Sequence, residues 1–195
     1  MQTVLKNLNP ITSTVLSSIE ARWQKVLPFL KKRGHVIFIS DRYRFWDTPG
    51  FVQQSLAKTL IDHGIKVTWL DGLDWRKRHF AVPYKSPLLK VSSLGCLPGR
   101  RFSFADKVSV QWQANQIRKI QSEGQPITWV QGSLDERISE KLESIDVFSI
   151  FDDAFSQSPD GNLSRKTKII LSQNAATDDR FRDKYPFKSF LALPP

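Results

Sequence analysis

Short apolar runs rich in β-branched residues alternate with helical segments along most of this chain. The run 35–40 has the length and composition of a strand buried on both faces. Thr48 and Pro49 suit the N-cap and the first position of a helix over 48–64, and a second strand is expected over 65–70. These segments predict a βαβ unit, which requires parallel strands and a right-handed crossover.

The same alternation continues to the end of the chain. Further strands are predicted over 88–94, 127–131, 147–151, 168–172 and 187–193, further helices over 104–122, 134–143 and 175–184, and loops over 71–87 and 156–165. Strands that alternate with helices predict an α/β fold: a doubly wound, mostly parallel sheet of Rossmann-like type. We expect about six or seven strands, with the strand that begins near His35 in a central position.

An amphipathic, basic segment precedes this alternation. Between Thr12 and Arg33, apolar residues recur at steps of three and four, and the C-terminal end carries the cations that a helix dipole favours there. Such a helix packs on the domain or lies on an anionic membrane, and the sequence leaves both open. We therefore expect an N-terminal helical extension over 1–33 and a Rossmann-like domain over 34–195.

Composition limits the class of protein further. The chain of 195 residues is 40% apolar and 25% charged, as is typical of a folded globular domain. No apolar run approaches the roughly 18 to 20 residues needed to cross a bilayer, and residues 1–10 show no secretory signal. Cys96 is the single cysteine, which excludes an internal disulfide. We expect a cytoplasmic protein.

Positive charge is concentrated in the first half of the chain. The formal net charge is +10, and residues 1–101 hold 17 Lys and Arg against 6 Asp and Glu, whereas residues 102–195 hold 12 against 13. A basic surface of this kind favours an anionic partner, such as nucleic acid, phospholipid headgroups or a phosphorylated substrate.

Candidate site residues follow the predicted strands, because ligands of an open parallel sheet bind outside the carboxyl ends of its strands. They are Arg42, Arg44, Trp46 and Asp47 after the first strand, Asp152 and Asp153 after a later one, and Asn174 after the next. Adjacent carboxylates on an extended backbone point in opposite directions, so one of Asp152 and Asp153 is expected to face the ligand. Capping of a helix or loop is the alternative role for these carboxylates.

Several common mechanisms lack their motifs. Neither of the glycine-rich phosphate loops, G-x-G-x-x-G and G-x-x-x-x-G-K-[ST], occurs, and no G-x-S-x-G elbow is present. The histidines His35, His63 and His79 have no zinc-site spacing, so no metal site is expected. The residues alone thus predict an α/β domain with a basic cleft.

In order, these segments resemble the N-terminal half of the two-domain (GT-B) glycosyltransferases of bacterial polysaccharide and glycolipid synthesis. Residues 44–57, RFWDTPGFVQQSLA, are similar to that family's R-W-D-x-P-x-x-x-Q-x-L-A stretch and include Gln53. The likeness continues through the turn into 65–70, the strand 127–130, the segment FDDAF at 151–155, and the passage 168–194 that leads into the family's interdomain hinge.

The resemblance implies hexosyl transfer from a nucleotide sugar to a polysaccharide or lipid-linked acceptor. It implies that Asp152 or Asp153 binds sugar hydroxyls or acts as base, and that the substrate-binding residues are Arg42, Arg44, Trp46, Asp47, Gln53 and Asn174. In the family, a second Rossmann domain with most of the nucleotide-sugar site follows the position of Pro194. We therefore expect an acceptor-binding half without a cofactor, inactive alone, which either works with a C-terminal half on a separate chain or is a fragment of a longer ancestor. The stereochemistry of transfer stays open.

The alternative is a non-catalytic basic α/β protein that binds nucleic acid or an anionic membrane surface. Six tryptophans and the Arg-Lys-Arg run at 76–78 are compatible with it, although helix-turn-helix, RNA-recognition and zinc-finger patterns are missing. A lipid-linked acceptor would make the protein peripheral on the inner face of the membrane.

Overall fold

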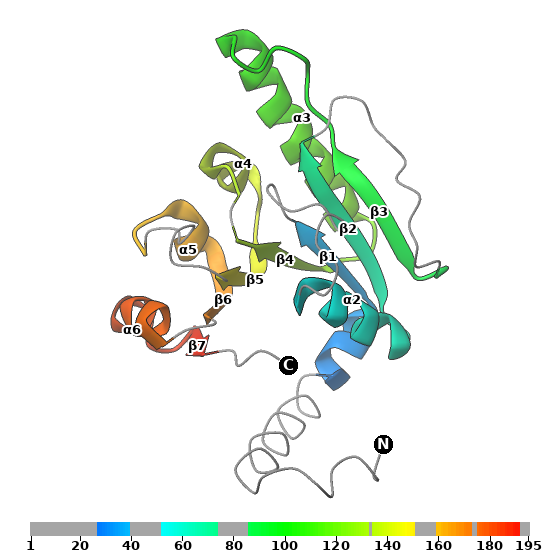
Figure 1. The fold of residues 1–195 in the computed structure, drawn as a ribbon, viewed down its shortest axis with the longest axis vertical. Helices are drawn as coiled ribbons and strands as arrows, with labels where there is room; N and C mark the ends of the chain where they lie inside the picture. Colours follow the sequence, from blue (N-terminus) through cyan, green and yellow to red (C-terminus); the bar gives the residue numbers. More distant parts are fainter. Residues whose placement is uncertain are drawn as a thin grey trace, which may run out of the picture.

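The computed structural model describes residues 27–39, 52–73, 86–132, 134–150, 159–172 and 175–191. Strands and helices alternate along this part of the chain (Figure 1). After a helical segment over 27–33 the elements are β1 (His35–Ile39), α2 (Val52–Asp62), β2 (Lys66–Leu73), β3 (Leu89–Leu94), α3 (Ser103–Ser122), β4 (Ile127–Gln131), α4 (Glu136–Lys141), β5 (Ile145–Ile150), α5 (Asn162–Lys166), β6 (Thr167–Ser172), α6 (Ala175–Lys184) and β7 (Ser189–Leu191).

The strands of the described part form one seven-stranded sheet in the order β3-β2-β1-β4-β5-β6-β7, and every neighbouring pair is parallel. From β1 the chain runs outward through β2 to β3, then crosses back over β1 to β4 and continues in the other direction. The strand order therefore reverses between β1 and β4, which is the topological switch point of a doubly wound fold. The predicted α/β class and the internal position of the strand at His35 are confirmed.

Four helices cover one face of this sheet (Figure 1). The larger apolar core lies there, because α3, α4, α5 and α6 each direct a buried side chain at the strands. Its members include Ile37 and Ile39 of β1, Val110, Ala114 and Ile117 of α3, Ile138 of α4, Leu163 of α5 and Phe181 of α6. Right-handed crossovers explain this arrangement. Helices whose connections run in the same direction across the sheet lie on the same face.

The opposite face is covered by α2 and by the helix over 27–33. Leu27 and Leu30 of that helix are buried in the same cluster as Ala57 and Leu60 of α2, so the end of the predicted N-terminal extension belongs to the core. The rest of 1–33 lies outside the described residues. None of the helices in the described part is both long enough and apolar enough to cross a bilayer.

Three aromatic rings join the central strands on this second face. Phe38 of β1 is in register with Trp69 of β2 and with Trp129 of β4. Its ring centroid lies 5.2 Å from that of each tryptophan, at tilted interplanar angles. Such contacts add to the burial of the rings, so the strands on both sides of the switch point are held by packing as well as by their hydrogen bonds.

Two predicted loops differ from the structure. β2 extends to Leu73, into the predicted loop 71–87, and α5 begins at Asn162, inside the predicted loop 156–165. The α5 helix depends on tertiary contacts: Leu163 is fully buried, and Nζ of Lys188 donates hydrogen bonds to the carbonyl oxygens of Ser164, Arg165 and Thr167. These bonds satisfy carbonyl groups that a helix C-terminus leaves free.

Candidate functional site

The predicted site residues follow strands that end at one edge of the sheet. Because the strands are parallel, β1, β5 and β6 have their carboxyl ends, at Ile39, Ile150 and Ser172, on the same edge. The predicted residues beyond those ends, namely Arg42, Arg44, Trp46, Asp47, Asp152, Asp153 and Asn174, lie outside the described residues. Gln53 is the second residue of α2, and only its backbone is described. Their roles therefore stay predictions.

Gln131 is a polar side chain at this carboxyl edge. It is the last residue of β4, directly after Val130, which is in register with the last residue of β1. It therefore ends the strand that borders the switch point. Its side chain is 1% exposed, and neither Oε1 nor Nε2 has a hydrogen-bond partner among the described residues.

An unpartnered amide in this position is costly to the fold. Burying a polar side chain without partners costs about 1 to 3 kcal/mol, so such groups are rare and call for an explanation. A buried amide offers two N–H donors and one carbonyl acceptor. Gly132 follows with φ of 74°, a conformation that glycine adopts without strain, and turns the chain away from the edge. The amide of Gln131 is thus a buried group with both donors and an acceptor that no described residue satisfies.

Two more buried polar side chains lack partners in the described part of the chain. Ser172 ends β6, and its Oγ is unpaired. Gln113, on the inner face of α3, has an unpaired side-chain amide one turn from Gln116, which binds the backbone just beyond β3. All three therefore lie near the carboxyl edge. They do not share a face, because alternation along β4 puts Gln131 with Trp129 on the α2 face, whereas Ser172 and Gln113 belong to the other face.

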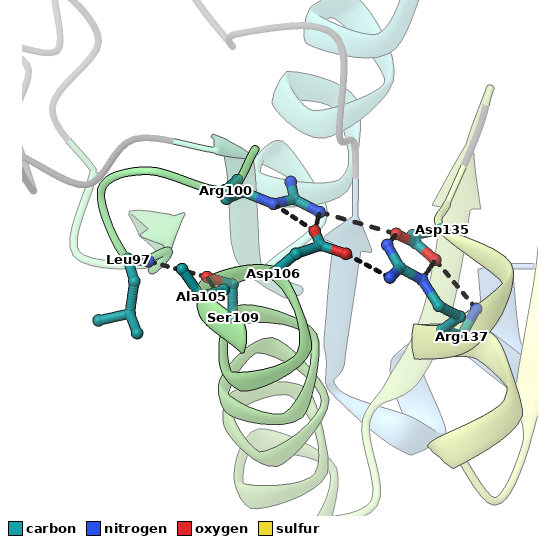
Figure 2. Close-up of polar contacts among 7 residues, drawn as sticks. All are labelled: Leu97, Arg100, Ala105, Asp106, Ser109, Asp135 and Arg137. Carbon is teal, nitrogen blue, oxygen red and sulfur yellow. Dashed lines mark hydrogen bonds and ion pairs between the residues drawn. The ribbon is translucent and has the colours of Figure 1, made fainter. Parts of the chain in front are cut away.

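Four charged side chains form a closed ion-pair ring between the first turns of α3 and α4 (Figure 2). Nε of Arg100 donates to Asp106 at 3.0 Å, and Nη2 of Arg100 lies 3.7 Å from Asp135. Arg137 donates to both carboxylate oxygens of Asp135, at 3.0 and 2.6 Å, and its Nη1 pairs with Asp106. Asp135 also caps α4, since it accepts from the backbone N–H of Arg137. The ring ties the N-terminal ends of the two helices together.

This ion-pair ring is suited to positioning and not to proton transfer. Hydrogen bonds from Arg137 hold the pKa of Asp106 and the pKa of Asp135 below the usual value of 3.8, and those same bonds raise the pKa of Arg137. A general acid or base needs a pKa near the working pH. Both carboxylates stay ionised and engaged, so their contribution is to fix the loop that leaves β4 close to Gln131.

The loop between β3 and α3 runs along the helix that follows it. The backbone N–H of Gly95 donates to Gln116 at 3.0 Å, and that of Leu97 donates to Oγ of Ser109 at 2.9 Å. Ser109 in turn donates to the carbonyl oxygen of Ala105 at 2.7 Å (Figure 2). The contact of Leu97 lies closer to the N-terminus of α3 than that of Gly95, so the loop extends beyond the end of β3 before α3 begins.

No group of three or more His, Cys, Asp or Glu side chains suitable for a metal ion occurs among the residues that the structure describes. Sequence reasoning missed Gln131, although a signal was present: it is a polar residue that ends an otherwise apolar strand and stands before a glycine. The ion-pair ring had no such signal, because its members are separated by up to 37 positions and meet only through the packing of α3 on α4.

Comparisons with known proteins identify no relative of this chain: no protein-family model, no curated protein and no solved structure matches it significantly.

Proposed function

We propose that this chain is the acceptor-binding half of a glycosyltransferase built from two Rossmann-like domains. The observation that carries the proposal is the position of the resembling segments relative to the strands. Residues 40–57 follow β1, residues 151–155 follow β5, and the passage after Ser172 follows β6. All three strands end at the carboxyl edge of one parallel sheet, where ligands of such sheets bind.

The unpartnered amide of Gln131 supports a ligand rich in hydroxyl groups. A sugar hydroxyl both donates and accepts hydrogen bonds, and the amide of Gln131 can do both at the same place. A ligand that satisfies Gln131 would recover the free energy that the fold loses by burying it. This argument supports an acceptor sugar at the switch point without depending on the segments outside the described residues.

The proposed roles divide the chemistry among three groups of residues. Arg42, Arg44, Trp46, Asp47 and Gln53 would bind the acceptor, with the arginines facing its anionic part. Asp152 or Asp153 would bind sugar hydroxyls or take the proton of the attacking hydroxyl, and Asn174 would bind substrate as well. Adjacent strand-end carboxylates point in different directions, so one of the pair is expected to carry the larger effect.

The donor side of the reaction requires a second domain. In this proposal a second Rossmann-like half supplies most of the nucleotide-sugar site. Closure of the two halves excludes water and places the departing diphosphate near helix N-termini and basic groups. The chain described here would bind acceptor but would neither transfer sugar nor hydrolyse a nucleotide sugar alone.

Reconstitution tests this function. The purified chain is assayed with UDP-, GDP-, ADP- and dTDP-sugars for release of nucleotide, first alone and then with a second-half domain encoded beside it. We expect turnover only in the mixture, and an at least tenfold lower rate for Asp152→Asn or Asp153→Asn. Robust transfer by the isolated chain, or no turnover with any partner half, would contradict the proposal.

Asp160 supplies a matched control for those two substitutions. Its carboxylate pairs with Lys184 at the C-terminal end of α6, and the neighbouring Pro159 accepts a hydrogen bond from Tyr185. These contacts place Asp160 near the amino edge of the sheet, where β7 begins, away from the carboxyl edge. Asp160→Asn is therefore expected to leave the rate of the reconstituted complex unchanged, and equal losses at Asp152, Asp153 and Asp160 would mean that the site is misplaced.

A second candidate, a non-catalytic module that binds an anionic partner, is favoured by the uneven charge of the chain. Residues 86–122, which include β3 and α3, hold six basic residues and one acidic residue, and the acidic one, Asp106, is already paired with two arginines. Tight binding to nucleic acid with a steep salt dependence, combined with no transfer in any mixture, would select this function.

A further inference from the structure

The N-terminal end of α3 presents exposed aromatic and basic side chains together. Arg101, Phe102, Ser103 and Phe104 are consecutive and all exposed, with 61% of Phe102 and 77% of Phe104 accessible. Lys107, one turn further along α3, is exposed as well. We refer to Arg101, Phe102, Phe104 and Lys107 as the α3 tip. Large apolar side chains that gather at one exposed place on a folded protein mark an interaction site.

The α3 tip projects well beyond the sheet. Gly95, the first residue after β3, is hydrogen-bonded to Gln116, whereas α3 begins at Ser103. At a rise of about 1.5 Å per residue, the tip lies about 20 Å further along the helix axis than the end of β3. Figure 1 shows this end of α3 beyond the arrowheads of β2 and β3, at one extreme of the molecule. A flat surface can reach it without meeting the sheet.

The sequence at the α3 tip lowers the stability of the helix, because its N-cap residue is unfavourable. Phe102 occupies the N-cap of α3 with extended backbone angles and makes no capping hydrogen bond. Serine, threonine, aspartate and asparagine are preferred at this position because their side chains satisfy a free N–H group of the first turn. Phe102 therefore neither caps α3 nor lies in the apolar core, and local choices that oppose the fold are expected at functional sites.

The turn before α3 holds the Phe102 ring in place. The backbone N–H of Phe102 donates to the carbonyl oxygen of Gly99 at 2.9 Å, and Gly99 has φ of 78°. A Cβ atom on Gly99 would lie 3.2 Å from the Phe102 ring, so glycine permits both the turn and the close approach. The guanidinium carbon of Arg101 lies 5.1 Å from the centroid of the same ring. The ring and a cation are thus presented side by side.

The charge of the α3 tip is positive. Asp106 is the one acidic residue in 86–122, and Arg100 and Arg137 already compensate it in the ion-pair ring. Arg101 and Lys107 have no acidic partner among the described residues. The ring also ties this end of α3 to α4, which makes the tip a fixed feature of the domain.

We propose that the α3 tip docks on the interface of an anionic lipid bilayer. Phe102 and Phe104 would insert at the boundary of headgroups and acyl chains, while Arg101 and Lys107 bind lipid phosphates. A lipid is favoured over nucleic acid because Arg101 covers one face of Phe102, which leaves a single face of that ring for a stacked base. Insertion into a bilayer needs no free face.

Docking in this way turns the carboxyl edge of the sheet toward the membrane. The α3 tip and Gln131 both lie toward the carboxyl edge of the sheet, although α3 covers one face and Gln131 ends β4 on the other face. A lipid-linked acceptor would then meet the edge that carries the candidate site, and this last step rests on the proposed function. The docking itself does not, because it is measured without any sugar donor or partner half.

Cosedimentation with vesicles tests the docking. The full chain is mixed with vesicles of phosphatidylcholine alone, or of phosphatidylcholine with phosphatidylglycerol, at low and at high salt. We expect binding only to the anionic vesicles, and weaker binding at high salt because the charges are screened. The double variant Phe102→Ser, Phe104→Ser is expected to bind about tenfold or more weakly. Serine at position 102 supplies an N-cap, so the thermal midpoint should be unchanged or higher.

Matched controls separate the tip from general exposure and charge. Phe187 is 95% exposed and precedes β7 at the amino edge, so Phe187→Ser should bind vesicles like the wild type. Arg101→Ser, Lys107→Ser should weaken binding severalfold, whereas Arg118→Ser, Lys119→Ser, at the other end of α3, should not. Wild-type binding by the Phe102, Phe104 variant would overturn the proposal. Preferential binding of the wild type to oligothymidylate would also overturn it. So would a wild-type dimer that the Phe102, Phe104 variant alone fails to form.

Discussion

Nε1 of Trp129 donates a 2.6 Å hydrogen bond to Oγ of Ser149, and both side chains are buried. The two residues lie on the neighbouring strands β4 and β5, so the bond joins the strand that borders the switch point to the next one. An indole N–H has no second way to be satisfied in an apolar layer. This pair explains why a serine is tolerated inside the core.

Removal of the Ser149 hydroxyl should therefore destabilise the protein. Ser149→Ala leaves the indole N–H buried and unpaired, and we expect the free energy of unfolding to fall by about 1 to 3 kcal/mol. Urea denaturation measures this change. Ser122→Ala is the control, since the Ser122 hydroxyl is exposed and bonds only to the carbonyl oxygen of Lys119, and its loss should be below about 0.5 kcal/mol. Equal losses at the two positions would show that the buried bond is not made.

Arg137→Gln should raise the pKa values of two carboxyls at once. Side-chain hydrogen bonds from Arg137 are the main cause of the lowered pKa of Asp135 and of Asp106. A carboxyl whose pKa is lowered by folding stabilises the protein above its unfolded pKa of about 3.8, and that stability is lost as the pH falls through the folded value. The stability difference between the wild type and Arg137→Gln should thus narrow below about pH 4.

Carbon-13 NMR titration of the aspartate carboxyls follows this directly. Both Asp135 and Asp106 should titrate at higher pH in Arg137→Gln, while Arg101→Gln, one position from Arg100 but outside the ion-pair ring, should move neither. A shift confined to one of the two carboxyls would mean that Arg137 does not bridge them.

His35 predicts a loss of stability in mild acid. Burial, then the charges of Lys66 and Lys90, lower the pKa of His35 to about 4, and the ring is hydrogen-bonded to Thr68 at 2.8 Å. In the unfolded chain His35 is protonated near pH 6.5, whereas in the native state it stays neutral down to about pH 4. The stability present above pH 6.5 is therefore lost as the pH falls toward 4. From pH 7 to pH 5 we expect a decrease of about 1 kcal/mol, a value reduced because the ring is partly exposed.

Urea denaturation at the two pH values measures this decrease. His35→Gln should remove most of it, whereas His63→Gln, at an exposed turn after α2, should retain it. A wild-type stability that is flat between pH 7 and pH 5 would mean that His35 is protonated in the native state as easily as in the unfolded chain.

Most of the fold could be predicted because its signals are local. Buried parallel strands are short apolar runs, and β4 was predicted with the bounds that it has in the structure. The α5 helix could not be predicted in this way, because five residues show no periodicity and its C-terminal carbonyls are satisfied by Lys188, which lies far along the chain. Tertiary contacts decide such elements, and no local pattern contains them.

The candidate site could be predicted only as an edge. Ligands bind beyond the carboxyl ends of parallel strands, and this rule selects the residues after β1, β5 and β6. The structure confirms that these strands end at one edge of the sheet. Gln131 could not be predicted, because its burial without a hydrogen-bond partner depends on the residues packed around it. The α3 tip was hidden for the converse reason: its phenylalanines look like core residues until their exposure is known.

The rate of the reconstituted transferase with Gln131→Leu tests the central claim, that the carboxyl edge of β4 binds the acceptor. Leucine removes an unpaired buried amide, so the free energy of unfolding should be unchanged or higher by up to about 2 kcal/mol. The transfer rate should nevertheless fall at least tenfold. Gln121→Leu is the matched control, because Gln121 binds Thr128 and Ser144 near the amino edge, and its rate should match the wild type. A full transfer rate with Gln131→Leu would contradict the account.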